Sequence, residues 1–386
     1  MAPGAITIFL RSLKMKKKTF LLLVLALIVA GVSFAQRVGD TVQYAGSNYT
    51  VTAINGDDVT MRKVVAQGDG PINWTAVASS PFGTSDVIDV AYGNNTWVAV
   101  ANEGKVAYSS DGRTWTLVTW TAAMPTPFGT SNNQMYAVAF GNGIFIAVGR
   151  QGMASSPDGR TWTKIGTSNP NNLAFGGGRW VAVGGAGGTA YSTDNGSTWT
   201  NVSAGDVFGT STAANRSGIF SVAYGNNRWI IGGDGGRMAT SSNGASWTAV
   251  ANTTFPSGGQ NYEINDIAYA NNRWVAVGAR GMAYSTDGAN WTSVTTAVRA
   301  VVFQGGSSIN VGGVAFGNNR WVAVGADGRI GYSADGAAWT AVANTTIWQY
   351  TNDRNQTVRA YIRAVAYGGG RFVAVGSQGK IAYCDW

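Results

Sequence analysis

A four-part unit recurs seven times along this chain, and a clear copy reads VAFGNNRWVAVGADGRIGYSADGAAWTAV at residues 314–342. Its segments VAF, RWVAV, RIGYS and WTAV are rich in β-branched and aromatic residues and are too short for helices. The turns between them contain Gly, Asn or Asp, which accept the positive φ angles of tight hairpins. The unit therefore predicts a meander of four antiparallel strands.

The copies are offset in a way that predicts a closed ring. They begin at Val90, Val138, Leu173, Val222, Ile267, Val314 and Val365. The tryptophan of the fourth strand recurs at Trp74, Trp115, Trp162, Trp199, Trp247, Trp291 and Trp339. The first tryptophan precedes every start, whereas the last copy ends without a fourth strand, so we expect residues 74–77 to supply that strand. Four strands in units of roughly 35 to 51 residues are typical of a β-propeller, here all-β with seven blades over residues 71–386, whereas a solenoid needs capped ends.

Residues 1–35 have the organisation of a signal peptide. A basic start at 16–18 precedes an apolar run at 20–32, and the small-x-small sequence SFA ends at Ala35. Met15 makes a better start for such a signal than Met1. We expect export to the periplasm, the cell surface or the medium. No later apolar run approaches the ~20 residues of a membrane helix, so we expect no transmembrane anchor after signal removal.

Residues 36–70 lie outside the repeat. Alternating runs at 41–44, 49–54 and 59–64 are separated by turn residues and predict a small β meander. The sequence QGDGP that follows at 67–71 is typical of a linker.

Charge and cysteine content limit the classes of function. The formal net charge is +8, but residues 1–35 hold five basic and no acidic side chains, which leaves +3 for the rest. A nucleic-acid partner is not expected, because it requires clustered Lys and Arg in the folded part. Cys384 is the single cysteine, so no intramolecular disulfide can form. It occupies the place of a repeat Ser, which predicts a buried, unreactive thiol.

The third turn of the unit resembles the Asp-box, also called the BNR repeat, with the pattern Ser-x-Asp-x-Gly-x-x-Trp. STDNGSTW at 192–199 matches it in full, most other copies are one residue shorter, and the fourth has Asn243 in place of Asp. Sialidases, some xyloglucanases, sortilin-type receptors and the photosystem II assembly factor share this box, so the resemblance spans enzymes and non-enzymes. In those families the box is a structural turn away from the ligand site. We expect the same of its acidic residues, Asp111, Asp158, Asp194, Asp287 and Asp335.

Candidate ligand-binding residues fall on the face where the blade-to-blade loops meet the turns between second and third strands. The turns contribute polar side chains from different blades, which form either a binding ring or a solvated rim: Glu103, Gln151, Asp234, Arg280, Asp327 and Gln378. The long loops add side chains that the repeat does not require: Trp120, Tyr262, Glu263, Trp348, Tyr350 and Arg359. Aromatic faces beside polar groups suit sugar rings or an apolar protein patch. The recurring FGTS, by contrast, is expected to bury Phe82, Phe128 and Phe208.

Catalysis has little support in the sequence. The absence of His excludes Ser-His-Asp and Cys-His catalysis and ordinary zinc sites, and we expect no cofactor or metal. Resemblance to a sialidase would imply an arginine triad and a Tyr-Glu pair, which Tyr262 and Glu263 match loosely, but the Arg-Ile-Pro signature is absent. Our preferred hypothesis is an exported, non-enzymatic propeller that binds a glycan or an envelope or extracellular protein. The alternatives are a sialidase-like glycoside hydrolase, using paired carboxylates, and a structural protein of the cell envelope.

Overall fold

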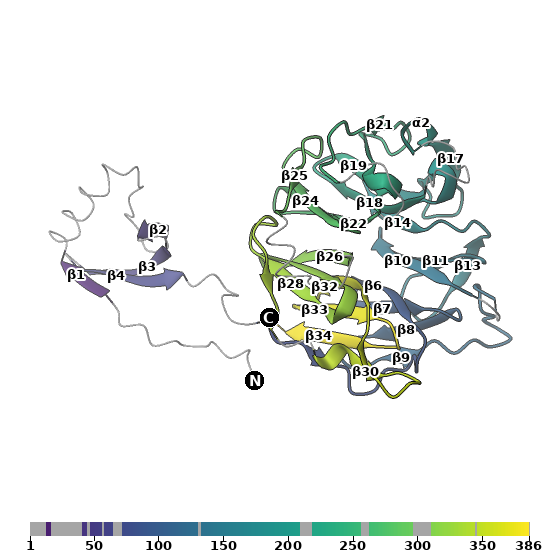
Figure 1. Ribbon diagram of the computed structural model, residues 1–386, viewed down its shortest axis with the longest axis horizontal. Coiled ribbons are helices and arrows are strands. Elements are labelled where there is room, and N and C mark those ends of the chain that lie inside the picture. Colours follow the sequence, from purple (N-terminus) through teal and green to yellow (C-terminus); the bar gives the residue numbers. More distant parts are fainter. Residues whose placement is uncertain are drawn as a thin grey trace. The chain divides into compact units, whose positions relative to one another are not determined.

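The computed structural model describes residues 13–16, 41–44, 47–55, 58–64, 72–129, 133–208, 218–255, 262–295, 310–343 and 346–385. The chain divides into two compact units, Met1–Gly70 and Pro71–Trp386 (Figure 1). Most of the predicted signal peptide and the predicted linker lie outside the described residues.

The larger unit is all-β and contains seven blades of four antiparallel strands, as predicted. From inner to outer strand, the first three blades are β6 (Val87–Gly93), β7 (Thr96–Ala101), β8 (Lys105–Ser109) and β9 (Thr116–Leu117); β10 (Met135–Gly141), β11 (Ile144–Gly149), β12 (Gly152–Ser156) and β13 (Thr163–Gly166); β14 (Asn172–Gly176), β15 (Arg179–Val183), β16 (Gly188–Ser192) and β17 (Thr200–Ser203). The next three are β18 (Ile219–Gly225), β19 (Arg228–Gly233), β20 (Met238–Ser241) and β21 (Thr248–Ala249); β22 (Ile264–Ala270), β23 (Arg273–Gly278), β24 (Gly281–Ser285) and β25 (Thr292–Ser293); β26 (Val311–Gly317), β27 (Arg320–Gly325), β28 (Ile330–Ser333) and β29 (Thr340–Ala341).

The seventh blade combines strands from both ends of this unit. It contains β32 (Ile362–Gly368), β33 (Arg371–Gly376), β34 (Ile381–Asp385) and, as its outer strand, β5 (Thr75–Ala76). Ala382 pairs with Ala76 and Tyr383 with Thr75. Each inner strand contacts the inner strand of the next blade, including β32 with β6, so the blades form a closed ring.

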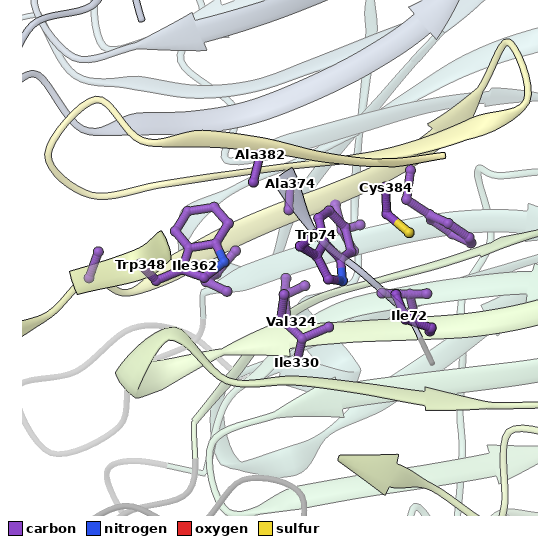
Figure 2. Close-up of a cluster of buried hydrophobic side chains, with 13 residues drawn as sticks. Ile72, Trp74, Val324, Ile330, Trp348, Ile362, Ala374, Ala382 and Cys384 are labelled. Atoms are coloured by element: carbon purple, nitrogen blue, oxygen red, sulfur yellow. The ribbon is translucent and has the colours of Figure 1, made fainter. Parts of the chain in front are cut away.

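The hydrophobic core lies between the blades. It consists of seven clusters, and each combines side chains of two successive blades. The tryptophans of the second strands are at most 1% exposed, as the repeat predicts: Trp97, Trp180, Trp229, Trp274 and Trp321. In the cluster of the sixth and seventh blades, Ile72 and Trp74 pack among residues of β27, β32 and β33 (Figure 2). Burial of apolar surface at every joint therefore holds the ring together.

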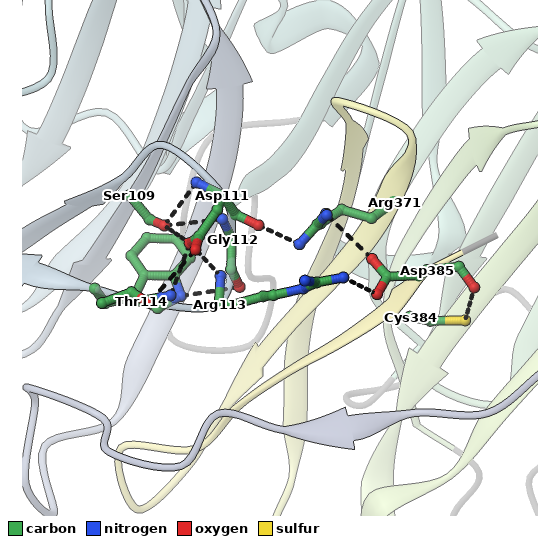
Figure 3. A network of polar contacts seen from close by, with 9 residues as sticks. Ser109, Asp111, Gly112, Arg113, Thr114, Arg371, Cys384 and Asp385 are labelled. Carbon is green, nitrogen blue, oxygen red and sulfur yellow. Dashed lines mark hydrogen bonds and ion pairs between the residues drawn. The ribbon is translucent and has the colours of Figure 1, made fainter. Parts of the chain in front are cut away.

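The turns that resemble the Asp-box are structural, as expected. In the first blade, Ser109 Oγ accepts a hydrogen bond from Gly112 N at 2.8 Å, and Asp111 Oδ1 accepts bonds from the N–H groups of Arg113 and Thr114, both at 2.8 Å (Figure 3). The other boxes repeat the bond to the serine Oγ. Their Asp, or Asn243 in the fourth, also accepts two backbone N–H groups, except in the third box, where Asp194 Oδ1 accepts that of Thr198. Such local bonds satisfy backbone groups that the meander leaves unpaired.

Each described box also forms part of a joint, because its glycine packs against the preceding blade. A Cβ atom on Gly336 would lie 2.7 Å from Val275 Cγ2, and one on Gly288 would lie 2.7 Å from Ile230 Cδ1. Between the last and first blades, Arg371 donates to the carbonyl of Asp111 and also pairs with Asp385 at 3.2 Å (Figure 3). The box thus fixes a turn and seats one blade on its neighbour.

The remaining elements are short. They are β30 (Gln349–Thr351) and β31 (Thr357–Arg359), which pair, the helix α2 (Gly205–Phe208), and the 3-10 turns η1 (Gly185–Gly187), η2 (Asp234–Gly236), η3 (Ala326–Gly328) and η4 (Thr346–Trp348). The unit Met1–Gly70 has a sheet ordered β1 (Leu13–Lys16), β4 (Asp58–Val64), β3 (Ser47–Asn55) and β2 (Thr41–Tyr44). Three of its strands coincide with the alternating runs of the sequence, and β1 lies inside the predicted signal peptide. In the described parts of the chain, no helix has the length and hydrophobicity that crossing a membrane requires.

Two glycine substitutions test the joint. Gly336 and Gly143 have similar left-handed φ angles, 75° and 82°, but a Cβ on Gly143 would meet no atom within 4 Å. Gly143→Ala should lower the free energy of unfolding by about 1 kcal/mol, the cost of the left-handed backbone. Gly336→Ala should cost about 1–3 kcal/mol more, because the methyl group overpacks the joint. Guanidinium unfolding of both variants measures the difference, and equal costs would contradict the proposed joint.

Candidate functional site

The propeller has a cavity in its central channel. It has a volume of about 650 Å³, and all seven inner strands contribute to its lining. Backbone bonds also bring the turns between second and third strands to the beginnings of the inner strands: Arg150 N donates to Gln134 O, and Ala279 N to Glu263 O. The loops and turns therefore share one face, as the sequence predicts, and the channel opens among them. A concave site of this size suits a small ligand or a short segment of a larger one.

A β-bulge near the start of six inner strands turns one residue toward this cavity. The pairing of inner and second strands skips Ile88, Tyr136, Phe220, Asn265, Gly312 and Arg363. All six line the channel and are partly exposed. Bulges often redirect a side chain at a functional site. Here they place six residues of different chemistry at equivalent positions, although the strands that carry them are near copies.

The residue after the bulge joins alternate pairs of blades. Asp89 Oδ1 accepts the N–H of Val90 at 2.8 Å, and Oδ2 accepts that of Val138, in the next blade, at 2.9 Å. Asp266 repeats this with Ile267 at 2.8 Å and Val314 at 2.9 Å. Because inner strands of successive blades belong to separate sheets, these side chains link strands that backbone bonds do not.

In the third blade, where β14 has no bulge, Asn172 takes the equivalent position. Its Oδ1 accepts the N–H of Leu173 at 2.7 Å, and its Nδ2 donates to Phe220 O of the next blade at 3.0 Å. An amide is thus native to a position where Asp89 and Asp266 are carboxylates.

Burial raises the pKa of Asp89 and of Asp266 to about 7. The backbone N–H donors oppose this shift, and the charge of Asp266 raises the pKa of Asp89 further. The chain contains no His, so these two carboxyl groups are unusual in titrating near neutrality. A perturbed carboxyl group in a cavity is a candidate for function.

The rest of the lining is mostly polar. Arg363 Nη2 pairs with Asp86 Oδ2 at 2.7 Å, which links the last blade to the first, and its guanidinium lies 5.6 Å from the centre of the Tyr361 ring. Glu263 also lines the channel, together with the amide side chains of Asn102, Gln134, Asn171, Asn172 and Asn265. Within the described residues, no group of three or more His, Cys, Asp and Glu side chains is arranged to hold a metal ion.

The turn residues predicted from the sequence are on the rim of this face, and none of the six lines the channel. Glu103, Arg280, Asp327 and Gln378 have left-handed φ angles between 56° and 67°. Glu103 pairs with Lys105 at 2.8 Å, and Gln378 contributes to a smaller cavity in the seventh blade. Gln151 is exposed, and its side chain lies against Gly129, where an added Cβ atom would be only 2.3 Å from Gln151 Oε1. Asp234 is a correction: it is 6% exposed and its Oδ2 accepts the N–H of Gly218 at 2.7 Å, so its role is structural.

The loop residues also separate by burial. Trp348 is a second correction, since it is fully buried between the sixth and seventh blades and cannot present its ring to a ligand (Figure 2). Trp120 and Tyr350 are partly buried against the core, whereas Arg359 is exposed. Tyr262 lies under the guanidinium of Arg280, 5.4 Å from the centre of its ring, and Glu263 beside it reaches the channel.

Two further expectations are confirmed. The phenylalanines of the FGTS sequences are at most 1% exposed. Cys384 is a buried free thiol, and burial raises its pKa to about 12, which makes it unreactive.

Sequence reasoning found Glu263 but missed the bulge residues of the channel and those that follow them. In a repeat alignment they lie one and two positions before the shared Val, Ile or Leu, where the copies differ in charge and size. That divergence was the available signal, but a strand of period two does not reveal a bulge.

Comparison with known proteins supports the fold alone. No protein-family model matches the chain, and no curated sequence matches it. Similar solved structures include YCF48 bound to a D1 peptide, with 14% identity over 83% of this chain and 98% of that one and a TM-score of 0.57. YCF48 from Cyanidioschyzon merolae has 18% identity over 81% and 98%, with a TM-score of 0.54. Catalytically inactive virginiamycin B lyase from Staphylococcus aureus, with quinupristin, has 8% identity over 82% and 99%, with a TM-score of 0.58. All three are seven-bladed β-propellers.

The raised pKa values predict how stability depends on pH. An acid with a raised pKa in the folded state binds protons more tightly there than in the unfolded chain, so stability falls as pH rises from about 4 through about 7. We expect the free energy of unfolding, measured with urea, to decrease between about pH 5 and about pH 8, by on the order of 1–2 kcal/mol per carboxyl group after allowance for solvent contact. Asp266→Asn, which removes the titrating carboxyl group, should flatten this slope, and an unchanged slope would contradict the assignment.

Proposed function

We propose that this chain is an exported, non-enzymatic propeller that binds a segment of a partner polypeptide at the mouth of its central channel. A sequence with seven similar blades can build identical channel walls, yet the six bulge residues differ in charge, size and polarity. This ring of different side chains on a uniform scaffold is the observation that carries the proposal. The side chains on the channel wall therefore differ from blade to blade, and recognition of an asymmetric ligand requires such differences.

The amide side chains favour a polypeptide. A primary amide can donate to a peptide carbonyl and accept from a peptide N–H. Asn102 and Gln134 have no side-chain hydrogen bond within the described residues, and Asn265 uses its Nδ2 on Asn310 and Val311 while its Oδ1 has no bond there. Tyr136 and Phe220 add aromatic surface beside these groups. YCF48, a propeller of similar fold, is described as bound to a D1 peptide, which supports a peptide site on such a scaffold.

The glycan hypothesis loses part of its basis. Sugar rings stack on exposed aromatic faces, but Trp348 is buried and Trp120 packs edge-on against Phe128, with ring centres 6.3 Å apart. The hydrolase hypothesis needs two carboxylates on one target. Glu263 lines the channel, whereas Asp327 belongs to the turn η3 on the rim. Asp89 and Asp266 also line the channel, but both oxygens of each already accept backbone N–H groups. Export is supported by the basic start, apolar run and SFA sequence of residues 16–35.

A displayed library of random peptides tests the proposal. Selection on residues 36–386 should enrich peptides that share a short motif. Gln134→Ala and Tyr136→Ala should each weaken the selected peptides by about tenfold, because each removes a contact at the mouth. Thr163→Ala, an exposed change on the outer strand of the same blade, is the matched control and should leave affinity unchanged. Affinities are measured by titration calorimetry.

Other outcomes would contradict the peptide site. A glycan array that gives a defined sugar ligand, with no peptide enriched, would favour the lectin-like hypothesis. Turnover of a glycoside panel that disappears in Glu263→Gln would favour the hydrolase. Stable co-purification with the cell wall or outer membrane, without a soluble ligand, would favour a structural envelope protein.

A further inference from the structure

The edge strand β1 of the N-terminal unit belongs to a segment that export would remove. Its four residues, Leu13–Lys16, pair antiparallel with Asp58 to Met61 of β4 (Figure 1). They lie inside residues 1–35, which have the organisation of a signal peptide. Cleavage after Ala35 would therefore leave a sheet ordered β4, β3 and β2, with β4 at its edge.

Loss of β1 would leave backbone groups of β4 without partners. In an antiparallel sheet, successive residues direct their N–H and C=O groups alternately to the two neighbouring strands. β4 has seven residues, and four of them pair with β1. Once these pairs are lost, the outward N–H and C=O groups form a row that is a template for another strand.

The sequence of β4 is complementary to itself in antiparallel pairing. It reads DVTMR from Asp58 to Arg62, with an acid at one end, a base at the other and Thr60 at the centre. Antiparallel pairing of two copies about Thr60 places Asp58 of each copy opposite Arg62 of the other. It also places Val59 opposite Met61. Opposite charges and apolar residues at facing positions stabilise an antiparallel pair, and twofold symmetry supplies each of these pairs twice.

A second β4 would present nearly the same residues to this edge as β1 does. β1 places the sequence LKMK opposite the residues from Met61 back to Asp58. A second copy paired about Thr60 would place VTMR, residues 59–62, at the same four positions. A branched aliphatic residue, a methionine and a base therefore recur in the same order, whereas Lys14 is replaced by a threonine. The edge that accepts β1 thus suits a second copy of β4.

We propose that the mature chain, residues 36–386, forms a dimer in which the β4 strands of two copies pair antiparallel about Thr60. The N-terminal sheet then continues from one copy into the other. This inference rests on the export in the proposed function, because residues 1–35 otherwise occupy the edge. A dimer also carries two channels, so it can hold a partner that displays the bound segment twice more tightly than one that displays it once.

The charges of β4 favour this alignment over others. Charged residues on an edge strand usually discourage association with other strands. In any other register of self-pairing, Asp58 is no longer opposite Arg62, so the two charges select one alignment. The strand β2, at the other edge of the sheet, reads TVQY and has no charged residue that could select a register in this way.

Charge reversal in residues 36–386 tests the pairing. Sedimentation equilibrium of the parent protein should give twice the monomer mass. Asp58→Arg and Arg62→Asp should each weaken the dimer by about tenfold or more, because each places like charges opposite each other at two positions. An equimolar mixture of the two variants should associate again, because every base of one copy then faces an acid of the other. A monomeric parent protein, or a mixture that associates no better than its components, would overturn the proposal.

A cysteine at the twofold axis tests the register directly. Thr60→Cys should form a disulfide-linked dimer under mild oxidation, because Cα atoms at facing positions of an antiparallel pair lie about 4.5–5.5 Å apart, within the span of a disulfide. Gln43→Cys, on β2, is the matched control and should remain a single chain on a non-reducing gel. The native Cys384 is buried. Equal cross-linking of both variants, or of neither, would overturn the twofold pairing.

The outcomes separate this inference from the proposed function. A monomer of residues 36–386 that binds selected peptides would overturn the dimer and leave the channel site intact. A dimer that enriches no peptide would support the pairing of β4 and overturn the peptide site. Mass spectrometry of the protein from its native cells checks export, and a chain that retains residues 1–35 would overturn both the export and the dimer.

Discussion

The contact between neighbouring blades is the interaction on which the rest of this structure depends. A single four-stranded meander buries little apolar surface of its own, and each of the seven hydrophobic clusters forms where two blades meet. The box glycine packs against the preceding blade, as Gly336 does against Val275, so the turn that ends one blade also positions the next. The same requirement explains closure by β5. Without a fourth strand and the indole of Trp74, the joint of the sixth and seventh blades would expose its core.

At the channel, the inner strand is the last strand of each blade's sheet and has no backbone ladder to the next blade. Inner strands lie side by side but in different sheets, so their edges are joined by side chains. Asp89 and Asp266 join them by accepting an N–H of the next blade, whereas the amide of Asn172 joins them by donating to a carbonyl of the next blade. An amide in place of either acid would turn an N–H donor toward the N–H that the carboxylate accepts, so these two links require a side chain with two acceptor oxygens.

The sequence predicted what repetition enforces. The strand order, the buried tryptophans and the capped turns could be predicted because the same residue pattern recurs at these positions in the copies of the unit. It predicted individual side chains less well where copies differ. Trp348 was assigned to the surface because its loop is long and irregular, but the loop folds back and the indole fills the core of the seventh blade. Asp234 was assigned to the rim by analogy with other turns, but it bonds to Gly218 in its own blade. Burial of a loop residue depends on tertiary contacts that the local sequence does not encode.

The bulges explain why the sequence pattern did not predict which residues line the channel. A regular strand sends alternate residues to opposite faces, and on that pattern Tyr136 would be one more residue of a repeating wall. The bulge inserts it without disturbing the pairing on either side, as Ala137 still faces Val148 and Met135 faces Gly149. The hydrophobic packing of the joints depends on the residues that remain in register, although the bulge residues Arg363 and Asn265 also make polar bonds to the next blade. Among the repeats of this chain the paired residues are similar while the inserted residues differ, so the bulge lets the channel wall vary while the strand pairing stays the same.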